Sequence, residues 1–337
     1  MIKRALGFAA LLALVYGAVW LGAAFWLRAR VDAFVADLAG KGYAIEHSEP
    51  LFVGFPAAVG LKLADLSVMA PSAQGGWHWQ GTPVVVRLHI GAPNTPVIDL
   101  GGVQRITGLL SAPHEGLSFN VDEGFATLTF GQGQALENIV VKMTGATVAG
   151  AASSETLLTV RDSVLDVSVA RGHIAWRMND IDVPQTIPPL GQTIHSVQIA
   201  ADVVGPAPAG PLREALTTWR DAGGAIEVRA FALDWPPASA AGTATLALDE
   251  ALQPMGAATI KFQGFFDIVA ALQAKGYVHD REVSMAKIVL GMLARPSASG
   301  EPELSLPITV QNRKLSAGPV ALMDMPEVRW DRDAKAP

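Results

Sequence analysis

The sequence predicts a mainly β, α+β fold, in which an N-terminal transmembrane helix precedes an elongated, curved antiparallel β-sheet with a few amphipathic helices packed on it. Residues 5–27 carry no charged side chain, which is typical of a membrane-spanning helix. Much of the remaining chain alternates apolar and polar residues with period two, and glycine or proline pairs separate the alternating runs. Together these patterns favour short strands joined by tight turns.

Composition excludes several classes of protein. The 337 residues include 25 Lys and Arg against 31 Asp and Glu, a net charge of −6, and the pI of 5.6 argues against nucleic-acid binding. With 17% charged and 50% apolar residues, the chain is too apolar to be disordered. The sequence has no cysteine, so disulfides, thiolate nucleophiles and cysteine-based metal sites are impossible.

The first helix is expected to anchor the chain in a membrane. The run contains Ala5, Leu14, Trp20 and Leu27, and at about 1.5 Å per residue it is roughly 35 Å long, enough to cross a ~30 Å hydrocarbon core. Basic residues at positions 3 and 4 favour a cytoplasmic N-terminus, which predicts a single-pass protein of the bacterial inner membrane with its bulk in the periplasm. A cleaved signal peptide, cut at residues 22–24, is the alternative.

Four regions follow from these patterns. Residues 1–30 are the anchor, 31–42 a short stalk helix, 43–330 the β-rich domain and 331–337 a frayed tail. Residues 149–154 are the best candidate for an internal break, although this stretch suits a hairpin loop equally well.

Within the β-rich domain, alternation predicts strands over 84–90, 126–130, 165–169, 174–178, 226–235 and 243–248, with a final pair over 304–310 and 314–322. Three stretches have helical spacing instead. A helix is expected from Pro211 to about Ala222, a second from Phe265 to Gly276, and a third through Met285 and Leu293 to just before Pro296.

Several short motifs carry a resemblance to a known family. They are Gly54-Phe55-Pro56, Gly223-Gly224 before residues 226–235, residues 242–249, Pro254-Met255-Gly256, Leu306-Pro307 and Gly318-Pro319. In their order along the chain they resemble the family called domain of unknown function 2125, over nearly the whole length. The resemblance implies a membrane-anchored envelope protein, rich in β-sheet, of the kind found in alphaproteobacteria. It implies no reaction and no catalytic residue.

Motifs for chemistry are nearly absent. Phosphate-loop, dinucleotide and Gly-x-Ser-x-Gly patterns are missing. Ser284 and Lys287 match Ser-x-x-Lys, but a polar first helical turn explains this pair better. The seven histidines are scattered; His78 and His89 come nearest to a cluster, and a surface or hydrogen-bonded role suits them better than a metal site. Asp180 and Asp182 lack calcium-loop spacing. We therefore expect no catalytic residue, no metal and no cofactor.

Apolar side chains are the remaining candidates for function. Trp77 and Trp79 share one face of a strand and, with Phe265, Phe266 and Leu272, are the candidates for lining an apolar site. For the two tryptophans, packing in the core or at an edge of the sheet is the simpler explanation. The preferred hypothesis is a non-enzymatic binder that holds a lipid or another apolar ligand on the curved sheet beside the inner membrane. The alternative is an anchored scaffold that docks an envelope protein.

Overall fold

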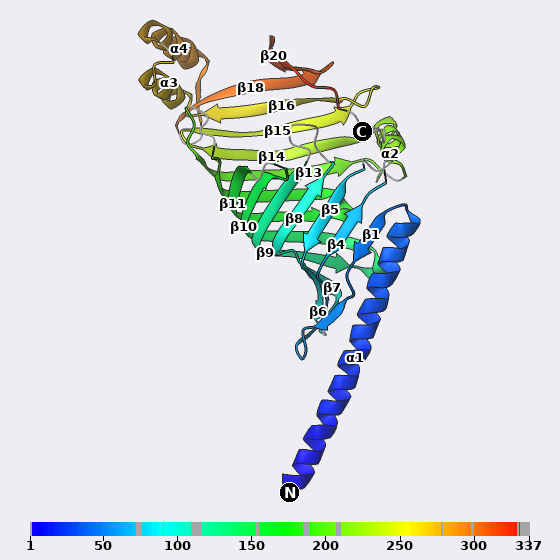
Figure 1. Cartoon of the computed structure of the whole chain (residues 1–337). Helices are drawn as coiled ribbons and strands as arrows, with labels where there is room; N and C mark the ends of the chain where they lie inside the picture. Colours follow the sequence, from blue (N-terminus) through cyan, green and yellow to red (C-terminus); the bar gives the residue numbers. More distant parts are fainter. Residues whose placement is uncertain are drawn as a thin grey trace.

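A computed structural model describes the protein over residues 2–71, 76–89, 91–108, 116–152, 155–184, 189–206, 210–277, 279–297, 300–328 and 330. The expected tail, 331–337, lies outside these residues. Mainly antiparallel strands build a single open curved sheet, with four α-helices around it (Figure 1). The predicted fold class is confirmed.

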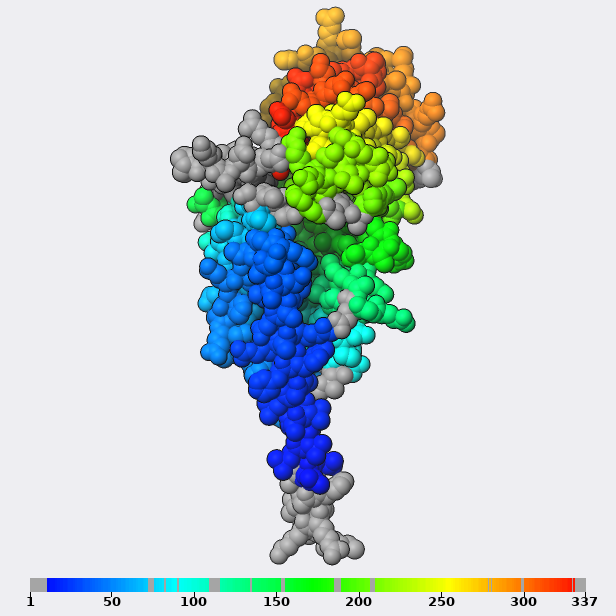
Figure 2. All heavy atoms as spheres, turned by 90° about the vertical axis from the view of Figure 1, so that its right-hand side faces the viewer, coloured from blue at the N-terminus to red at the C-terminus, as the bar shows by residue number. Residues whose placement is uncertain are grey.

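The first helix is longer than the sequence pattern predicts. Helix α1 runs without a break from Ile2 to Gly40, so the expected anchor and stalk form one helix. Its C-terminus is closed by bonds from the backbone N–H groups of Lys41 and Gly42, and Gly42 takes a positive φ of 89°. Figure 2 shows the body of the molecule narrowing onto α1, whose N-terminal part extends beyond it.

Two branches of strands leave strand β9 on the same edge. One branch has the order β9-β8-β5-β4-β1 and the other β9-β7-β6-β3-β2. The strands are β1 (Ala44–His47), β2 (Leu51–Val53), β3 (Ala58–Leu63), β4 (Leu66–Met69), β5 (His78–Thr82), β6 (Val84–His89), β7 (Ala92–Asp99), β8 (Gly102–Thr107) and β9 (Gly116–Phe130).

The branch point is the short link between β7 and β8. The N-terminal half of β9 pairs with β8, and residues 125–127 pair with β7. At the link, the Leu100 N–H donates to the Gly124 carbonyl (2.8 Å), while the Asp99 carboxylate accepts from the Gly101 N–H (3.1 Å) and pairs with Arg87 (3.1 Å). These bonds satisfy the backbone where the two branches separate.

Beyond β9 the sheet is an antiparallel meander. It comprises β10 (Leu136–Gly150), β11 (Thr156–Ser168), β12 (His173–Asp182), β13 (Thr193–Val204), β14 (Ala225–Trp235), β15 (Ala238–Leu248), β16 (Pro254–Gln263), β18 (Pro302–Gln311), β19 (Lys314–Ala317) and β20 (Val320–Asp324). The short strand β17 (Arg295–Pro296) pairs with the start of β18, while β16 pairs directly with β18. The predicted strand at 314–322 is wrong in one respect: a turn at Gly318 divides it into the hairpin β19–β20. Strands β10 and β11 pair on both sides of the suggested break at 149–154, of which 153 and 154 lie outside the described residues.

Three further helices lie at the borders of the sheet. Helix α2 (Leu212–Asp221), α3 (Phe265–Ala274) and α4 (Asp280–Leu293) match the three predicted helices. In α2, Trp219 is buried and its Nε1–H donates to the Val204 carbonyl (2.9 Å), which ties the helix to the end of β13. Helices α3 and α4 contact each other at the end of the sheet that lies far from α1 (Figure 1).

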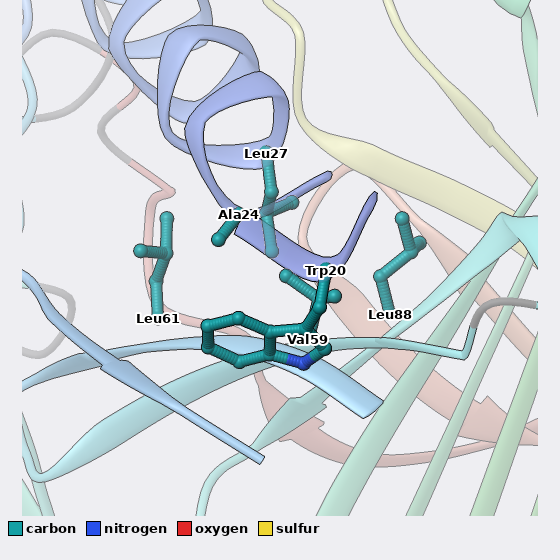
Figure 3. Packing of buried hydrophobic residues seen from close by; sticks show 6 residues of the cluster. All are labelled: Trp20, Ala24, Leu27, Val59, Leu61 and Leu88. Carbon is teal, nitrogen blue, oxygen red and sulfur yellow. The ribbon is translucent and has the colours of Figure 1, made fainter. Parts of the chain in front are cut away.

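One buried cluster joins α1 to the sheet. Trp20, Ala24 and Leu27 pack against Val59 and Leu61 of β3 and against Leu88 of β6, as Figure 3 shows. The Trp20 Nε1–H donates to the Ala58 carbonyl (2.8 Å). The middle of α1 is therefore part of the core of the β-rich domain.

A second cluster shows how the meander stays apolar on one face. The cluster contains three pairs of residues from single strands whose members are three residues apart: Met143 and Ala146, Met178 and Ile181, and Ile194 and Val197. Strict alternation would place them on opposite faces. The alternation of side chains between the two faces shifts by one residue at Gly145 and Asp180, which have positive φ angles of 63° and 48°. Arg161 lies opposite both residues, and regular pairing is interrupted at this row in both ladders. Residues on both sides of this row therefore share one face.

Candidate ligand-binding face and membrane contact

The face of the sheet that bears these clusters is apolar across the distal strands, β13 to β18. Its side chains come from alternate positions that pair across the ladders: Val197, Ile199 and Ala201; Ile226, Val228, Phe231 and Leu233; Ala240, Gly242, Ala244 and Leu246; Gly256, Ala258, Ile260 and Phe262; Leu304, Leu306 and Ile308. None of them is polar. We call this surface the apolar face.

The opposite face is polar. Gln198, Glu227, Thr243, Lys261 and Ser305 lie there, at positions that alternate with those of the apolar face. One buried carboxylate, Asp202, bonds the His173 imidazole (2.7 Å) and pairs with Arg229 on this side. The two faces thus differ in chemistry from β13 to β18.

Parts of the apolar face are open to solvent. Leu246 is 38% exposed and Leu306 is 37% exposed, and Trp176 of β12, which pairs with Ile199 next to this face, is 38% exposed. Among the described residues, the main contacts between helices and the sheet are those of α1 with β3 and β1, of α3 with β15 and of α4 with β18. Most of the apolar face therefore lacks a helical layer over it in the described part of the chain.

Curvature compensates in part for this missing layer. Val121, Val160 and Ile181 are buried, and the cluster around them consists of residues from β9 to β13 alone, within the described part. The sheet is curved (Figure 1), and a sheet that curves toward one face brings the side chains of that face into contact with one another. The burial of this cluster indicates that the apolar face is the inner face of the curve.

The tryptophans expected to line an apolar site belong to the branch β9-β8-β5-β4-β1, where Trp79 lies on β5 and Trp77 directly precedes it. Trp79 pairs with Val68 and Ile106, and Ile106 pairs with Leu117 of β9. Because paired residues share a face, Trp79 lies on the same side of the sheet as the apolar face. The Trp77 ring packs against Tyr43, with 6.1 Å between ring centroids. Both rings are half-buried, so they act as packing residues whose outer surface remains accessible.

Phe265, Phe266 and Leu272 lie on α3, at the opposite end of the sheet from β5 (Figure 1). The structure therefore does not bring the two predicted sets together. Phe265 and Phe266 border a hollow of about 310 Å³, but Asp234, Asp267 and Glu301 also line it. Carboxylates make this hollow unsuitable for an acyl chain.

A larger hollow of about 620 Å³ lies on the branch β1-β4-β5-β8. Leu66 and Val103 line it, but so do the charged residues Glu46, Asp65 and Arg105 and several polar ones, and Glu46, Gln80 and Arg105 lie on the side away from the apolar face. Neither hollow is an apolar cavity, so the apolar face itself is the stronger candidate for an apolar ligand.

Side chains that could take part in catalysis or bind a metal are dispersed over the molecule. Ser284 and Lys287 are both exposed on α4, so the lysine lacks the burial that would make it a base. The His78 ring bonds the Ser67 hydroxyl (2.8 Å), and His89 is exposed. Within the described ranges, no group of three or more His, Asp or Glu residues is arranged to hold a metal ion.

Residues of the expected anchor divide into two groups. Leu14 is 72% exposed on α1, whereas Trp20 and Leu27 are buried against the sheet, and the side chain of Ala5 lies outside the described part. Residues 11–40 of α1 are long and apolar enough to cross a membrane, a property that a signal sequence near an N-terminus shares.

The turn between β2 and β3 was missed by sequence reasoning. The Tyr16 hydroxyl donates to the Pro56 carbonyl, and the Phe55 ring meets the Trp20 ring edge-on with 5.5 Å between centroids. Only the uncharged Gly54-Phe55-Pro56 motif marked this turn in the sequence. Its role as a contact of α1 depends on tertiary structure, which the local pattern cannot reveal.

Helix α4 presents a second apolar surface. Val283 is buried, whereas large apolar side chains elsewhere on the helix are exposed, with Met292 at 80%. The exposed group is Met285, Ile288, Val289, Met292 and Leu293, at the spacing of one helical face. We call it the α4 stripe.

These features define a class: a protein with a candidate transmembrane helix at its N-terminus and one open, curved sheet that is apolar on its inner face. The chain belongs to the family described as an uncharacterized protein conserved in bacteria, domain of unknown function 2125, whose model matches residues 20–326. No curated protein and no solved structure shows significant similarity to the chain.

Proposed function

We propose that the protein is a non-enzymatic, membrane-anchored lipid binder, which holds acyl chains on the apolar face of its sheet from the periplasmic side of the bacterial inner membrane. The observation that carries this proposal is the unbroken apolar face from β13 to β18, which is curved and partly open. Such a surface offers no group for catalysis and no polar group for a sugar or nucleotide.

The energetics suit an acyl chain. Each buried CH₂ group contributes about 0.8 kcal/mol, so affinity requires an extended apolar surface without hydrogen-bonding groups. Small side chains at Ala240, Ala244 and Ala258 lie between larger ones on β14 and β18. A chain laid along this row would contact the larger side chains on both sides.

The test is native mass spectrometry of the full chain, released from detergent after purification from its own membranes. The full chain is needed because Trp20, Ala24 and Leu27 belong to the core. We expect a bound phospholipid mass. Leu246→Asp, on the apolar face, should lose it, while Thr245→Asp, the neighbouring exposed position on the polar face, should retain it. A lipid-free mass for the unaltered chain after incubation with membrane lipids would refute the proposal.

The α4 stripe favours a second function, that of an anchored scaffold for an envelope protein. Five large apolar side chains on 14 residues form an exposed surface at the end of the molecule away from α1. A photo-crosslinking residue at Met292 should capture one defined partner in cells, while the same residue at the exposed Lys287 should not. Equal capture from both positions would argue against docking.

A further inference from the structure

We propose that the turn between β2 and β3 inserts into the membrane beside α1, so that the β-rich domain enters the bilayer leaflet on its own side. The inference rests on the proposed anchoring and concerns the depth at which the domain lies. It names the bilayer as a direct partner of residues 54–58, which we call the β2–β3 tip.

The contact between the tip and α1 lies at the centre of the uncharged run. Tyr16, which bonds the Pro56 carbonyl, is equally far from Ala5 and Leu27. If the tip were to stay outside the bilayer, only residues 5–15 would remain to cross it. At 1.5 Å per residue that segment is about 16 Å long, half of a ~30 Å hydrocarbon core. The helix cannot slide further into the membrane without burying Lys3 and Arg4 in the hydrocarbon, which is costly.

The hairpin that carries the tip is suited to this position. Residues 51–61 carry no charge, and the strand beside it continues into a second uncharged stretch, 88–98, with no Asp, Glu, Lys or Arg. Ala58 pairs with His89, so the two stretches meet at the same end of the sheet. Leu51 and Phe55 are more than 60% exposed, so the hairpin presents two large apolar side chains to its surroundings.

Charged residues limit how deeply the β2–β3 tip can enter the bilayer. The ion pair of Arg87 and Asp99 lies level with Gly60 and Val53, since Arg87 pairs with Gly60 and Gly60 with Val53. On α1, this level falls between Trp20, which contacts Phe55, and Phe25, which contacts Phe52. The membrane surface placed there leaves residues 5–22 to cross, about 27 Å of helix. The tip then reaches roughly 9 Å below the surface, and Tyr16, Trp20 and Phe55 form an interfacial aromatic group.

A functional consequence follows for lipid entry. The Trp20, Val59, Leu61 and Leu88 cluster is continuous in register with the apolar face through β6, β7 and β9. With the tip inserted, this surface begins within the leaflet that supplies the lipid, so an acyl chain would not have to cross water to reach the sheet.

Depth-dependent fluorescence quenching tests the inference on the full chain. Because the chain has no cysteine, each variant Phe55→Cys, Leu51→Cys, Leu14→Cys and Thr218→Cys carries one site for an environment-sensitive dye. The variants are reconstituted into vesicles of phosphatidylethanolamine and phosphatidylglycerol that carry a nitroxide either at the headgroup or near the chain end. Leu14 and Thr218, both exposed, serve as controls for the hydrocarbon and for water.

We expect the dye at Phe55 to show blue-shifted emission and to lose most of it to the shallow nitroxide, with Leu51 quenched less. The dye at Leu14 should respond most to the deep nitroxide, and the dye at Thr218 to neither. If Phe55 behaves like Thr218 while Leu14 is quenched, the inserted tip is refuted and the anchor stands. If Leu14 is also unquenched, the anchoring proposal fails together with the inference.

Discussion

Replacing Trp20 should release α1 from the β-rich domain. The indole is 7% exposed, packs against Val59, Leu61 and Leu88, and donates from Nε1 to the Ala58 carbonyl at 2.8 Å. Truncating a buried tryptophan to alanine costs about 3–5 kcal/mol, and the lost hydrogen bond accounts for about 1 kcal/mol of this. Since about 1.4 kcal/mol is a factor of ten, even the lower figure weakens the docked state by more than about 100-fold.

The assay is chemical unfolding of the full chain in detergent, followed by hydrogen exchange of the β3 amides. Trp20→Ala should lower the free energy of unfolding by about 3–5 kcal/mol and accelerate exchange in β3. Trp20→Phe keeps most of the apolar volume and should lose only about 1 kcal/mol. Leu14→Ala, on the exposed side of the same helix, should change the stability by less than about 0.5 kcal/mol. Equal losses for Trp20→Ala and Leu14→Ala would refute the packing of α1 against the sheet.

Two further predictions concern the α3–α4 region. Gly264 and Gly276 have similar positive φ angles, 78° and 75°, but a Cβ at Gly264 would collide with the Pro237 carbonyl, whereas a Cβ at Gly276 would meet nothing within 4 Å. Gly264→Ala should therefore lower the melting temperature clearly more than Gly276→Ala. Equal shifts would show that strain in φ alone matters. The His279 backbone N–H donates to the Glu282 carboxylate (2.9 Å), which lowers the pKa of Glu282. The interaction that lowers this pKa stabilises α4 at pH values above the ordinary glutamate pKa, and the stabilisation is lost as the pH falls through the lowered value. NMR should therefore show the first turn of α4 fraying in acid. Glu282→Gln should abolish this dependence on pH.

Local patterns predicted the elements better than their arrangement. Alternation located the strands at 226–235 and 243–248, and proline and glycine bounded α2, because these signals depend only on neighbours in the chain. The branching of β9 depends on the link at Asp99 to Gly101 meeting Gly124, which is more than 20 residues further along the chain, and none of these residues carries a periodic signal. For the site, the sequence indicates only that Trp77 and Trp79 can share one face of a strand, because the remote position of Phe265 and the docking of Trp20 are consequences of tertiary structure.

The change of phase in the meander links the fold to the proposed function. Each long strand reads as apolar alternation on both sides of the row at Gly145, Arg161 and Asp180, but the two halves are out of register by one residue. A regular strand with this sequence would expose one apolar half on each side of the sheet. The positive φ angles of Gly145 and Asp180 and the Arg161–Asp180 ion pair (2.9 Å) restore a single apolar face. Without this row the face from the β3–α1 cluster to β18 would be interrupted at β10 to β12, and an acyl chain that enters beside α1 would have no continuous surface to follow.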